Sequence, residues 1–458
     1  MLGATAARLA TNRAFASAQM GFSLGWHVVL ASFGVGFPLL VLYAEWRGQR
    51  SRDPVYAELA RRWSKVLGVL FAVGAVSGTI LSFELGILWP GLMGRFGSVF
   101  GFPFSLEGFA FFVEAIFLGI YLYGWDRVSP RAHLASGVPI ALAGLASAWF
   151  VVTANSWMND PTGFRLVHGK VTDVSPWAGM LNPATPTETV HMLAAAYMVT
   201  GFGVASVYAV AQLRGRTGRY HATGMRLGLA MGAVLAPLQG VVGDLSARYV
   251  ASHQPVKLAA MEAVFHTSRG VPESLGGIAY GGRLHLAVRI PDGLSLLTHF
   301  DPNSAVTGLD AAPAGTRPPV NPVHLSFDAM VLVGFFLLLV AGWSAWAWWR
   351  RRSLPGTRPY LFALVAAGPL AVAALEAGWV ATEVGRQPWI VYRVMRVSEA
   401  VSPAPGLWVG LPVLLVVYAA LTAVLLVVLR RLAATEAPGA QAAAPGSGRE
   451  ADLREAGP

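Results

Sequence analysis

The chain has 458 residues, of which 55% are apolar and 13% are charged, whereas about a quarter of the residues of an ordinary soluble protein carry charge. This composition excludes a typical water-soluble protein, and the net charge of +10 does not indicate nucleic-acid binding, because the cations lie in short loops between apolar spans. The chain contains no cysteine, which excludes disulfides, thiolate-held iron–sulfur clusters and covalently attached c-type haem.

Nine apolar runs follow one another along the chain, each long enough to cross a hydrocarbon core of about 30 Å. These runs are expected to be helices, because unpaired backbone groups are too costly in lipid. The predicted fold is therefore all-α, a polytopic membrane bundle of nine transmembrane helices. The expected spans are 19–44, 65–89, 104–124, 132–154, 188–212, 224–246, 323–348, 359–382 and 406–430.

The distribution of Lys and Arg predicts the orientation of these spans. Seventeen cations lie in the loops after spans one, three, five and seven and at the end of span nine, whereas eight lie in the short segments on the other side. By the positive-inside rule the N-terminus faces out and the C-terminus faces the cytoplasm. The chain then divides into helices one to six (1–246), an outer loop (247–322), helices seven to nine (323–432) and a cytoplasmic tail expected to be disordered (433–458).

Ionisable side chains within the spans are candidates for function, since burying them in a membrane is costly. Alternate spans run in opposite directions, and most of these candidates fall in the outer halves of their spans, so a site near the outer face is expected. The candidates, with one possible soft ligand, are His27, Glu84, Glu107, Glu114, His191, Glu376, Glu383 and Met330.

Two histidines and a methionine among these side chains are possible haem ligands. His191 and Met330 could fill both axial positions of one low-spin haem. Taken alone, Met330 is more readily explained as core packing, and His191 equally well as a hydrogen-bonded interfacial histidine. His27 could hold a second haem from one side, although an interhelical hydrogen bond explains it equally well.

The acidic residues form two pairs with the same spacing. Glu107 and Glu114 are close to two helical turns apart, so both project from one face of their helix. A buried carboxylate pair suits proton transfer, and the alternative is that each carboxylate pairs with a neighbouring cation or helix end. Glu376 and Glu383 repeat this spacing, and either could be a haem ligand or a proton acceptor.

Two sequence motifs carry a resemblance to a known family. The segment from Gly378 to Trp389 reads GWVATEVGRQPW, and the segment from Gln254 to Glu262 in the outer loop reads QPVKLAAME. They resemble the GWxxxExGRQPW signature and the QPxKLAAxE quinol-loop motif of cytochrome bd quinol oxidase subunit I. The resemblance covers spans one to eight. It implies a subunit of a bacterial plasma-membrane (inner-membrane) oxidase that oxidises quinol at the outer face and reduces O2 to water with cytoplasmic protons.

The resemblance also implies roles for individual residues. His191 and Met330 would ligate a low-spin haem b, and His27 and Glu383 would ligate a high-spin haem b and a haem d or third haem b, in an order left open. Trp379 and Arg386 would flank the haems, with Arg386 near a propionate. Glu107 and Glu114 would deliver protons, and Lys257 and Glu262 would bind quinol. The implied partners are subunit II, another multi-spanning chain, and a small single-helix subunit.

Some positions depart from the family pattern. Asp328 stands where the family usually has Arg, Ser17 where it often has Arg, and Glu84-Leu85-Gly86 where Gln-Phe-Gly is usual. The outer loop has the short form and resembles the cyanide-insensitive branch. Two alternatives stay open: a membrane haem b electron carrier linked to quinol but without oxygen chemistry, and a haem-free transporter that uses the same buried glutamates.

Overall fold

The computed structural model describes residues 2–434, and in this part of the chain nine helices are long and apolar enough to cross a membrane, as predicted. The long helices are α1 (Leu2–Ser51), α2 (Pro54–Leu88), α3 (Pro90–Gly124), α4 (Pro130–Asn159), α6 (Thr185–Leu213), α7 (Arg219–His253), α10 (Val320–Arg351), α11 (Arg358–Gly385) and α13 (Gly410–Ala434). Between them lie the short helices α5 (Pro176–Met180), α8 (Pro255–Met261), α9 (Gly293–His299) and α12 (Val397–Ala400).

Most of the long helices extend beyond the apolar runs that predicted them. Helix α2, for example, begins at Pro54, where the side chain of Asp53 caps the helix by accepting a hydrogen bond of 3.1 Å from the backbone N–H of Val55. Hydropathy marks only the part of a helix in contact with lipid, whereas its ends are set by capping residues and prolines in the polar loops.

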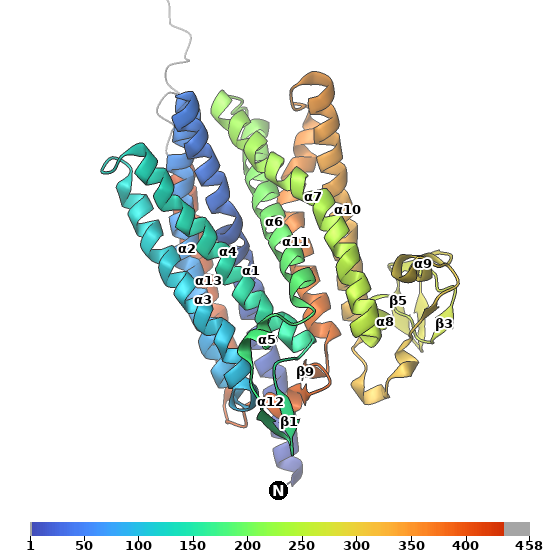
Figure 1. Ribbon diagram of the computed structural model, residues 1–458. Helices are drawn as coiled ribbons and strands as arrows, with labels where there is room; N and C mark the ends of the chain where they lie inside the picture. The colour runs from blue at the N-terminus through green and yellow to red at the C-terminus, as the bar shows by residue number, and fades with distance from the viewer. Residues whose placement is uncertain (1, 435–458) are drawn as a thin grey trace, which may run out of the picture.

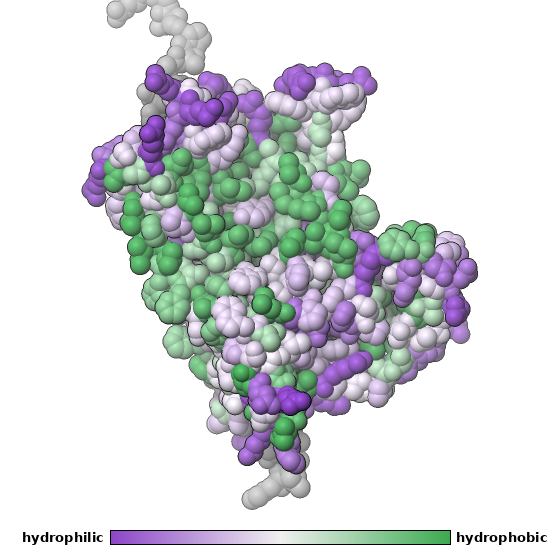
Figure 2. Space-filling view, viewed as in Figure 1, coloured by the Kyte–Doolittle hydropathy of each residue, from purple (hydrophilic) through white to green (hydrophobic). Residues whose placement is uncertain are grey.

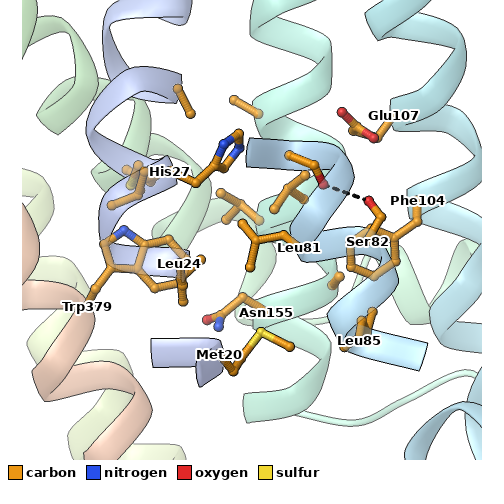
Figure 3. A pocket seen from close by; sticks show the side chains of 18 of the residues that line it. Met20, Leu24, His27, Leu81, Ser82, Leu85, Phe104, Glu107, Asn155 and Trp379 are labelled. Carbon is orange, nitrogen blue, oxygen red and sulfur yellow. Dashed lines mark hydrogen bonds between the residues drawn. The ribbon is translucent and has the colours of Figure 1, made fainter. Parts of the chain in front are cut away.

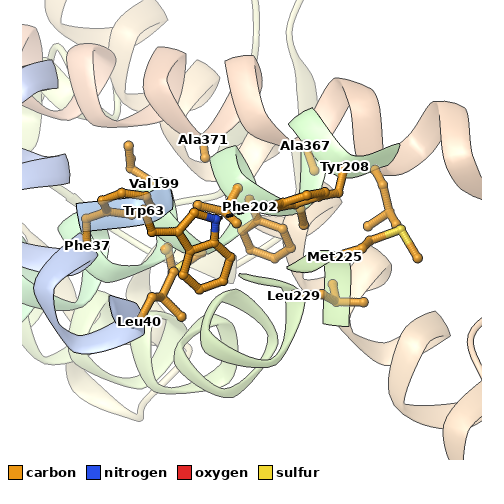
Figure 4. Packing of buried hydrophobic residues seen from close by; sticks show 14 of the residues in the cluster. Phe37, Leu40, Trp63, Val199, Phe202, Tyr208, Met225, Leu229, Ala367 and Ala371 are labelled. Atoms are coloured by element: carbon orange, nitrogen blue, oxygen red, sulfur yellow. Dashed lines mark hydrogen bonds between the residues drawn. The ribbon is translucent and has the colours of Figure 1, made fainter. Parts of the chain in front are cut away.

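The long helices run side by side, with the described N-terminal end of α1 at one end of the bundle (Figure 1). Helices α1, α2, α6, α7 and α11 meet around a buried aromatic core that contains Phe37, Trp63, Phe202 and Tyr208 (Figure 4). Helices α6 and α7 approach closely at a glycine contact, where a Cβ on Gly201 would lie 2.8 Å from the carbonyl oxygen of Gly228. Small residues at such contacts let helix backbones pack tightly.

The connection between α7 and α10 folds into a small unit, which we call the loop unit (residues 254–319). No secondary structure is expected there from the sequence, but the loop unit contains α8, α9 and short strands. Its strand pairs are β3 (Ser268–Arg269) with β8 (Ala305–Val306), β4 (Glu273–Leu275) with β7 (Val288–Ile290), and β5 (Ile278–Tyr280) with β6 (Arg283–His285). Its buried side chains, including Met261, Val271 and Leu294, form one cluster with Val323 of α10. The loop unit is therefore packed onto the bundle.

Two further strand pairs connect other helices: β1 (Arg165–Val167) with β2 (Lys170–Thr172), and β9 (Trp389–Val391) with β10 (Met395–Arg396). Apolar side chains cover the middle of the bundle and polar ones its ends (Figure 2). Large side chains such as Phe109, Leu332 and Val416 are about 70% exposed there, as expected of a surface that faces lipid. The predicted tail 433–458 lies, beyond Ala434, outside the described residues.

Candidate functional site

A cavity of about 550 Å³ lies among α1, α2, α3, α4 and α11. Its size falls within the range of roughly 300–1,000 Å³ that is usual for small-molecule and cofactor sites. Figure 3 shows His27, Glu107, Asn155 and Trp379 around this space. The structure thus brings together six of the predicted site residues, which are His27, Glu107, Glu114, Trp379, Glu383 and Arg386.

The hydrogen bonds of His27 leave one ring nitrogen available. Its Nδ1 lies 2.8 Å from the hydroxyl oxygen of Ser77, and that hydroxyl donates to the carbonyl oxygen of Gly74. Ser77 therefore accepts the Nδ1–H, and Nε2 keeps its lone pair. Gly78 packs against the ring, where a Cβ would lie 3.1 Å from Cε1. A histidine whose second nitrogen is held by a hydrogen bond is the usual form of an iron or zinc ligand.

Glu383 and Arg386 project from the end of α11 into the same region. One carboxylate oxygen of Glu383 accepts a hydrogen bond from Asn155, and the other accepts one of 2.5 Å from Arg386. Among the described residues, the buried Nε of Arg386 and Nε1 of Trp379 have no hydrogen-bond partner. Buried donors without partners are rare. These two beside the cavity fit the propionate carboxylates of a haem.

Glu107 and Glu114 line the cavity from α3. Glu107 accepts a hydrogen bond of 3.2 Å from the hydroxyl of Ser147 on α4. Glu114 is 6% exposed and faces Gly144, whose added Cβ would lie 3.6 Å from a carboxylate oxygen. Within residues 2–434 neither carboxylate forms an ion pair. The alternative that these glutamates pair with neighbouring cations therefore has no support in the structure.

His191 and Met330 do not line this cavity. The ring of His191 on α6 contacts α7, where the amide nitrogen of Gln239 lies 3.2 Å from its Nε2 and an added Cβ on Gly243 would lie 3.5 Å from its Cε1. The sulfur of Met330 on α10 would be 2.9 Å from a Cβ on Gly378 of α11. Each of these two potential ligands thus packs against a glycine of a neighbouring helix.

Lys257 belongs to a polar cluster that the sequence analysis did not predict. Its ammonium donates to the side-chain oxygen of Asn159 at 3.4 Å, and Arg386 donates to the same oxygen at 3.3 Å. The amide nitrogen of Asn159 donates to Glu188 at 2.8 Å. Burial lowers the pKa of Lys257 to about 8. Gln254 binds the backbone carbonyl of Asn159 at 2.7 Å, so the end of α4 joins the loop unit to the cavity.

Glu262 lies in a second polar cluster, together with Glu273, Asp328 and His324. Glu262 is 4% exposed, and its carboxyl group is hydrogen-bonded to that of Glu273. Burial and the neighbouring carboxylates Glu273 and Asp328 raise the pKa of Glu262 well above its usual value, and burial, followed by Asp328, raises the pKa of Glu273 to about 7. This cluster therefore holds at least one proton near neutral pH.

The comparisons with known proteins agree with this architecture. Residues 15–437 match the model of the cytochrome bd terminal oxidase subunit I family. The chain belongs to this family. The putative cytochrome bd menaquinol oxidase subunit I of Bacillus subtilis (strain 168) is 35% identical over 90% of this chain and 95% of that protein. The cytochrome bd ubiquinol oxidase subunit 1 of the same organism is 28% identical, over 82% of this chain and 83% of the relative.

A solved structure extends the comparison to three dimensions. The bd oxidase from Geobacillus thermodenitrificans superposes with a TM-score of 0.86 at 38% sequence identity, over 92% of this chain and 98% of that chain. The predicted all-α bundle and the predicted family are both confirmed. The chain is thus a multi-pass membrane subunit of a haem-dependent bd oxidase.

Asp328, a departure from the family pattern in the sequence analysis, has a structural role in this cytochrome bd subunit. Its carboxylate accepts a hydrogen bond of 2.5 Å from the backbone N–H of Gly276 in the loop unit. His324 lies one helical turn earlier and is fully buried, with its Nδ1 2.7 Å from the carbonyl oxygen of Met261 and its Nε2 2.9 Å from that of Gly276. Asp328 and His324 therefore attach the loop unit to α10.

Glu84 and Glu376 are the remaining acidic candidates, and neither lines the cavity. Both carboxylate oxygens of Glu84 are buried and have no hydrogen-bond partner in the described part of the chain. An added Cβ on Gly25 would lie 3.0 Å from a carboxylate oxygen of Glu376. Glu376 therefore packs against α1 beside the cavity, whereas Glu383 extends into it.

Proposed function

We propose that quinol is oxidised where the loop unit meets the bundle, beside Lys257 and Glu262, and that oxygen is reduced at the cavity lined by His27 and Glu383. As subunit I of a cytochrome bd oxidase, the chain works with subunit II to oxidise quinol and reduce O2. One observation supports the proposed division most directly. Lys257 of the loop unit and Arg386 of the cavity share Asn159 as their hydrogen-bond acceptor, so the two regions are adjacent and coupled.

The assignment of haems follows from the ligand chemistry. We assign a low-spin haem b to His191 and Met330, and the high-spin haem b and the haem d, or a third haem b in its place, to His27 and Glu383. Haem bound at these residues would supply electron transfer and the reduction of oxygen. The protein contributes the available Nε2 of His27, the carboxylate of Glu383 and the free donors of Arg386 and Trp379.

On the quinol side, oxidation of one quinol releases two electrons and two protons. The paired carboxylates of Glu262 and Glu273 are suited to accept a proton, because one of them can be ionised while the other stays protonated. The ammonium of Lys257, held by Asn159, can donate a hydrogen bond to a quinol oxygen. The partly exposed side chain of Glu273 can then pass the proton to the outer water.

On the oxygen side, the protons must reach the cavity from the cytoplasm. Glu107, Ser147 and Glu114 form a polar path along α3 and α4 at the cavity wall. The lower part of this path would be completed by subunit II. Proton release outside and uptake from the cytoplasm generate a proton-motive force without a pumping step.

The orientation of the chain in the membrane places the loop unit on the outer side. The loop unit faces the outside of the bacterial plasma membrane, because the ends rich in arginine face the cytoplasm. The division of the chain at residues 246 and 322 separates the bundle from the quinol-binding loop. A small single-helix subunit would cover part of the exposed apolar surface.

The proposal can be tested with the purified two-subunit complex. Replacing Glu107 with Ala should slow oxygen consumption but leave the reduction of haem by quinol largely intact, whereas Glu58→Ala on α2, in a part-exposed pair with Arg62, should change neither. Unaffected turnover in the Glu107 variant would remove this residue from the proton path. Reduced-minus-oxidised spectra address the alternatives: a spectrum of low-spin haem alone would indicate an electron carrier, and no haem band a transporter.

A further inference from the structure

The loop unit exposes an unusual number of large apolar side chains. Leu286, Phe300 and Val288 are 92%, 77% and 67% exposed, respectively. Three more, Ile290 on β7 and Leu296 and Leu297 on α9, are each 49% exposed. We call these six residues the loop patch. Clustered exposed apolar residues on a protein normally mark a surface that contacts another phase or molecule.

Helix α7 shows what lies next to the loop patch. It carries a row of exposed apolar side chains spaced three or four residues apart, which therefore lie on one face of the helix. A row of this kind on a membrane helix faces lipid. The row consists of Val234, Leu238, Val241 and Leu245.

The loop patch continues this row. Arg248 is the next residue on the same face of α7, and its guanidinium lies 3.7 Å from the centre of the Phe300 ring. Arg248 also forms an ion pair with Asp244 at 2.8 Å, which keeps its guanidinium at the outer end of the apolar row on α7. Phe300 therefore lies next to the outer end of the apolar row on α7, and the loop patch is contiguous with that row.

The position of α9 agrees with this continuity. Helix α9 lies on the side of the loop unit that faces back along the bundle, away from the described N-terminal end of α1 (Figure 1). In the same view, apolar residues cover that side of the loop unit at the level where the apolar surface of the bundle ends (Figure 2). The apolar side of the loop unit thus lies at the level where the apolar surface of the bundle ends, whereas the rest of the loop unit is predominantly polar in this view.

We propose that the loop patch rests in the outer leaflet of the membrane, with Leu296, Leu297 and Phe300 among the lipid acyl chains. An apolar face rimmed by polar residues binds lipid in this way when it lies at the interface. The occupant of the patch is thus the bilayer itself. This proposal rests on the proposed function, because it places the quinol-binding unit at the depth where a lipid-borne quinol leaves the acyl chains.

Spin labelling can test the position of the patch, because the chain has no native cysteine and a single substitution gives a unique label. The complex would be labelled at Leu297→Cys, or at Ala314→Cys as an exposed control outside the patch, and placed in lipid nanodiscs. We expect the label at 297 to be relaxed more by oxygen, which partitions into lipid, than by a water-soluble nickel chelate, and the label at 314 to show the reverse. Access of the nickel chelate to both labels would overturn the proposal. An immobilised label at 297 that neither reagent reaches would also overturn it, by indicating a protein partner or a second copy of the chain.

A kinetic test separates this proposal from the proposed function. The double variant Leu296→Ser/Leu297→Ser should raise the KM for a long-chain isoprenoid quinol in the bilayer several-fold, with an unchanged KM for a short water-soluble quinol. The conservative variant Leu296→Met/Leu297→Met should retain the native KM for both. Equal effects on the two quinols would overturn the proposed lipid contact, whereas an absence of quinol oxidation in the native complex would overturn the proposed function.

Discussion

Lys257 on α8 and Glu262 at its C-terminal cap belong to two separate buried clusters. Lys257 contacts Asn159 at the end of α4, whereas Glu262 contacts Glu273 in the loop unit. A helix turns by about 100° per residue, so positions five apart point in directions about 140° apart. The segment from Gln254 to Glu262 therefore presents a cation toward the cavity and a carboxyl group toward the loop unit and α10.

Asn159→Ala should impair quinol oxidation more than its neutral side chain suggests. The variant leaves Lys257, Arg386 and Glu188 each without one hydrogen-bond partner. A buried polar group left unsatisfied costs about 1–3 kcal/mol, which corresponds to a loss of about 5- to 150-fold in kcat/KM. Steady-state quinol oxidation measures this loss. Asn303→Ala in the exposed part of the loop unit is the control, and equal activity of the two variants would contradict the role of Asn159.

The rate of quinol oxidation should depend on pH through two groups. Glu273, with a pKa of about 7, must be ionised to take part in proton acceptance, so kcat/KM should rise as the pH increases through about 7. Lys257, with a pKa of about 8, must be protonated to donate, so kcat/KM should fall above about 8. The result is a bell-shaped profile.

Glu273→Gln tests the lower limb of this profile, because it keeps the shape of the side chain but cannot be ionised. We expect its profile to lose the rise near pH 7, while Asp301→Asn, an exposed carboxylate in the same unit, should keep the native profile. If Glu273→Gln retained the native rise, another group would control it.

Asp328→Asn should raise the reduction potential of the low-spin haem, because it removes a negative charge two residues from Met330. The shift should be on the order of tens of millivolts, since the site is partly screened. Redox titration of the low-spin absorption band measures this potential. Asp244→Asn on the exposed face of α7 is the control, and an unchanged potential in Asp328→Asn would place the haem away from this carboxylate.

Gly378→Ala should disturb the low-spin haem that we assign to Met330, because the added Cβ would lie 2.9 Å from the methionine sulfur. The sulfur must then shift, which weakens its bond to iron and alters the low-spin band. Gly86→Ala adds a methyl group where nothing lies within 4 Å and should leave the spectrum unchanged. Identical spectra for the two variants would argue against Met330 as a ligand.

Much of the architecture could be predicted from the sequence, because lipid imposes strong constraints on a spanning chain. All nine spans are visible as apolar runs, and ionisable residues in or next to them identified four side chains around the cavity, His27, Glu107, Glu114 and Glu383. The family resemblance added Trp379 and Arg386. Asn155 and Asn159 were missed, since neutral amides near a span end produce no such signal. The strand pairs of the loop unit were also missed. Strands of two or three residues are too short to show an alternating pattern, and their positions depend on contacts with α10 such as Asp328 to Gly276.

The single side chain of Asn159 has a consequence for how such oxidases can diverge. Gln254 and Lys257, at the start of the loop unit, donate hydrogen bonds to Asn159 beside the cavity. Substitutions of these two residues would therefore disturb oxygen chemistry as well as quinol affinity. Between residues 263 and 319, all of which the structure describes, no side chain forms a hydrogen bond with α4. Insertions should therefore be tolerated far better after Glu262 than between Gln254 and Glu262. A chimeric loop taken from a relative should function only if residues 254–262 are transferred unchanged.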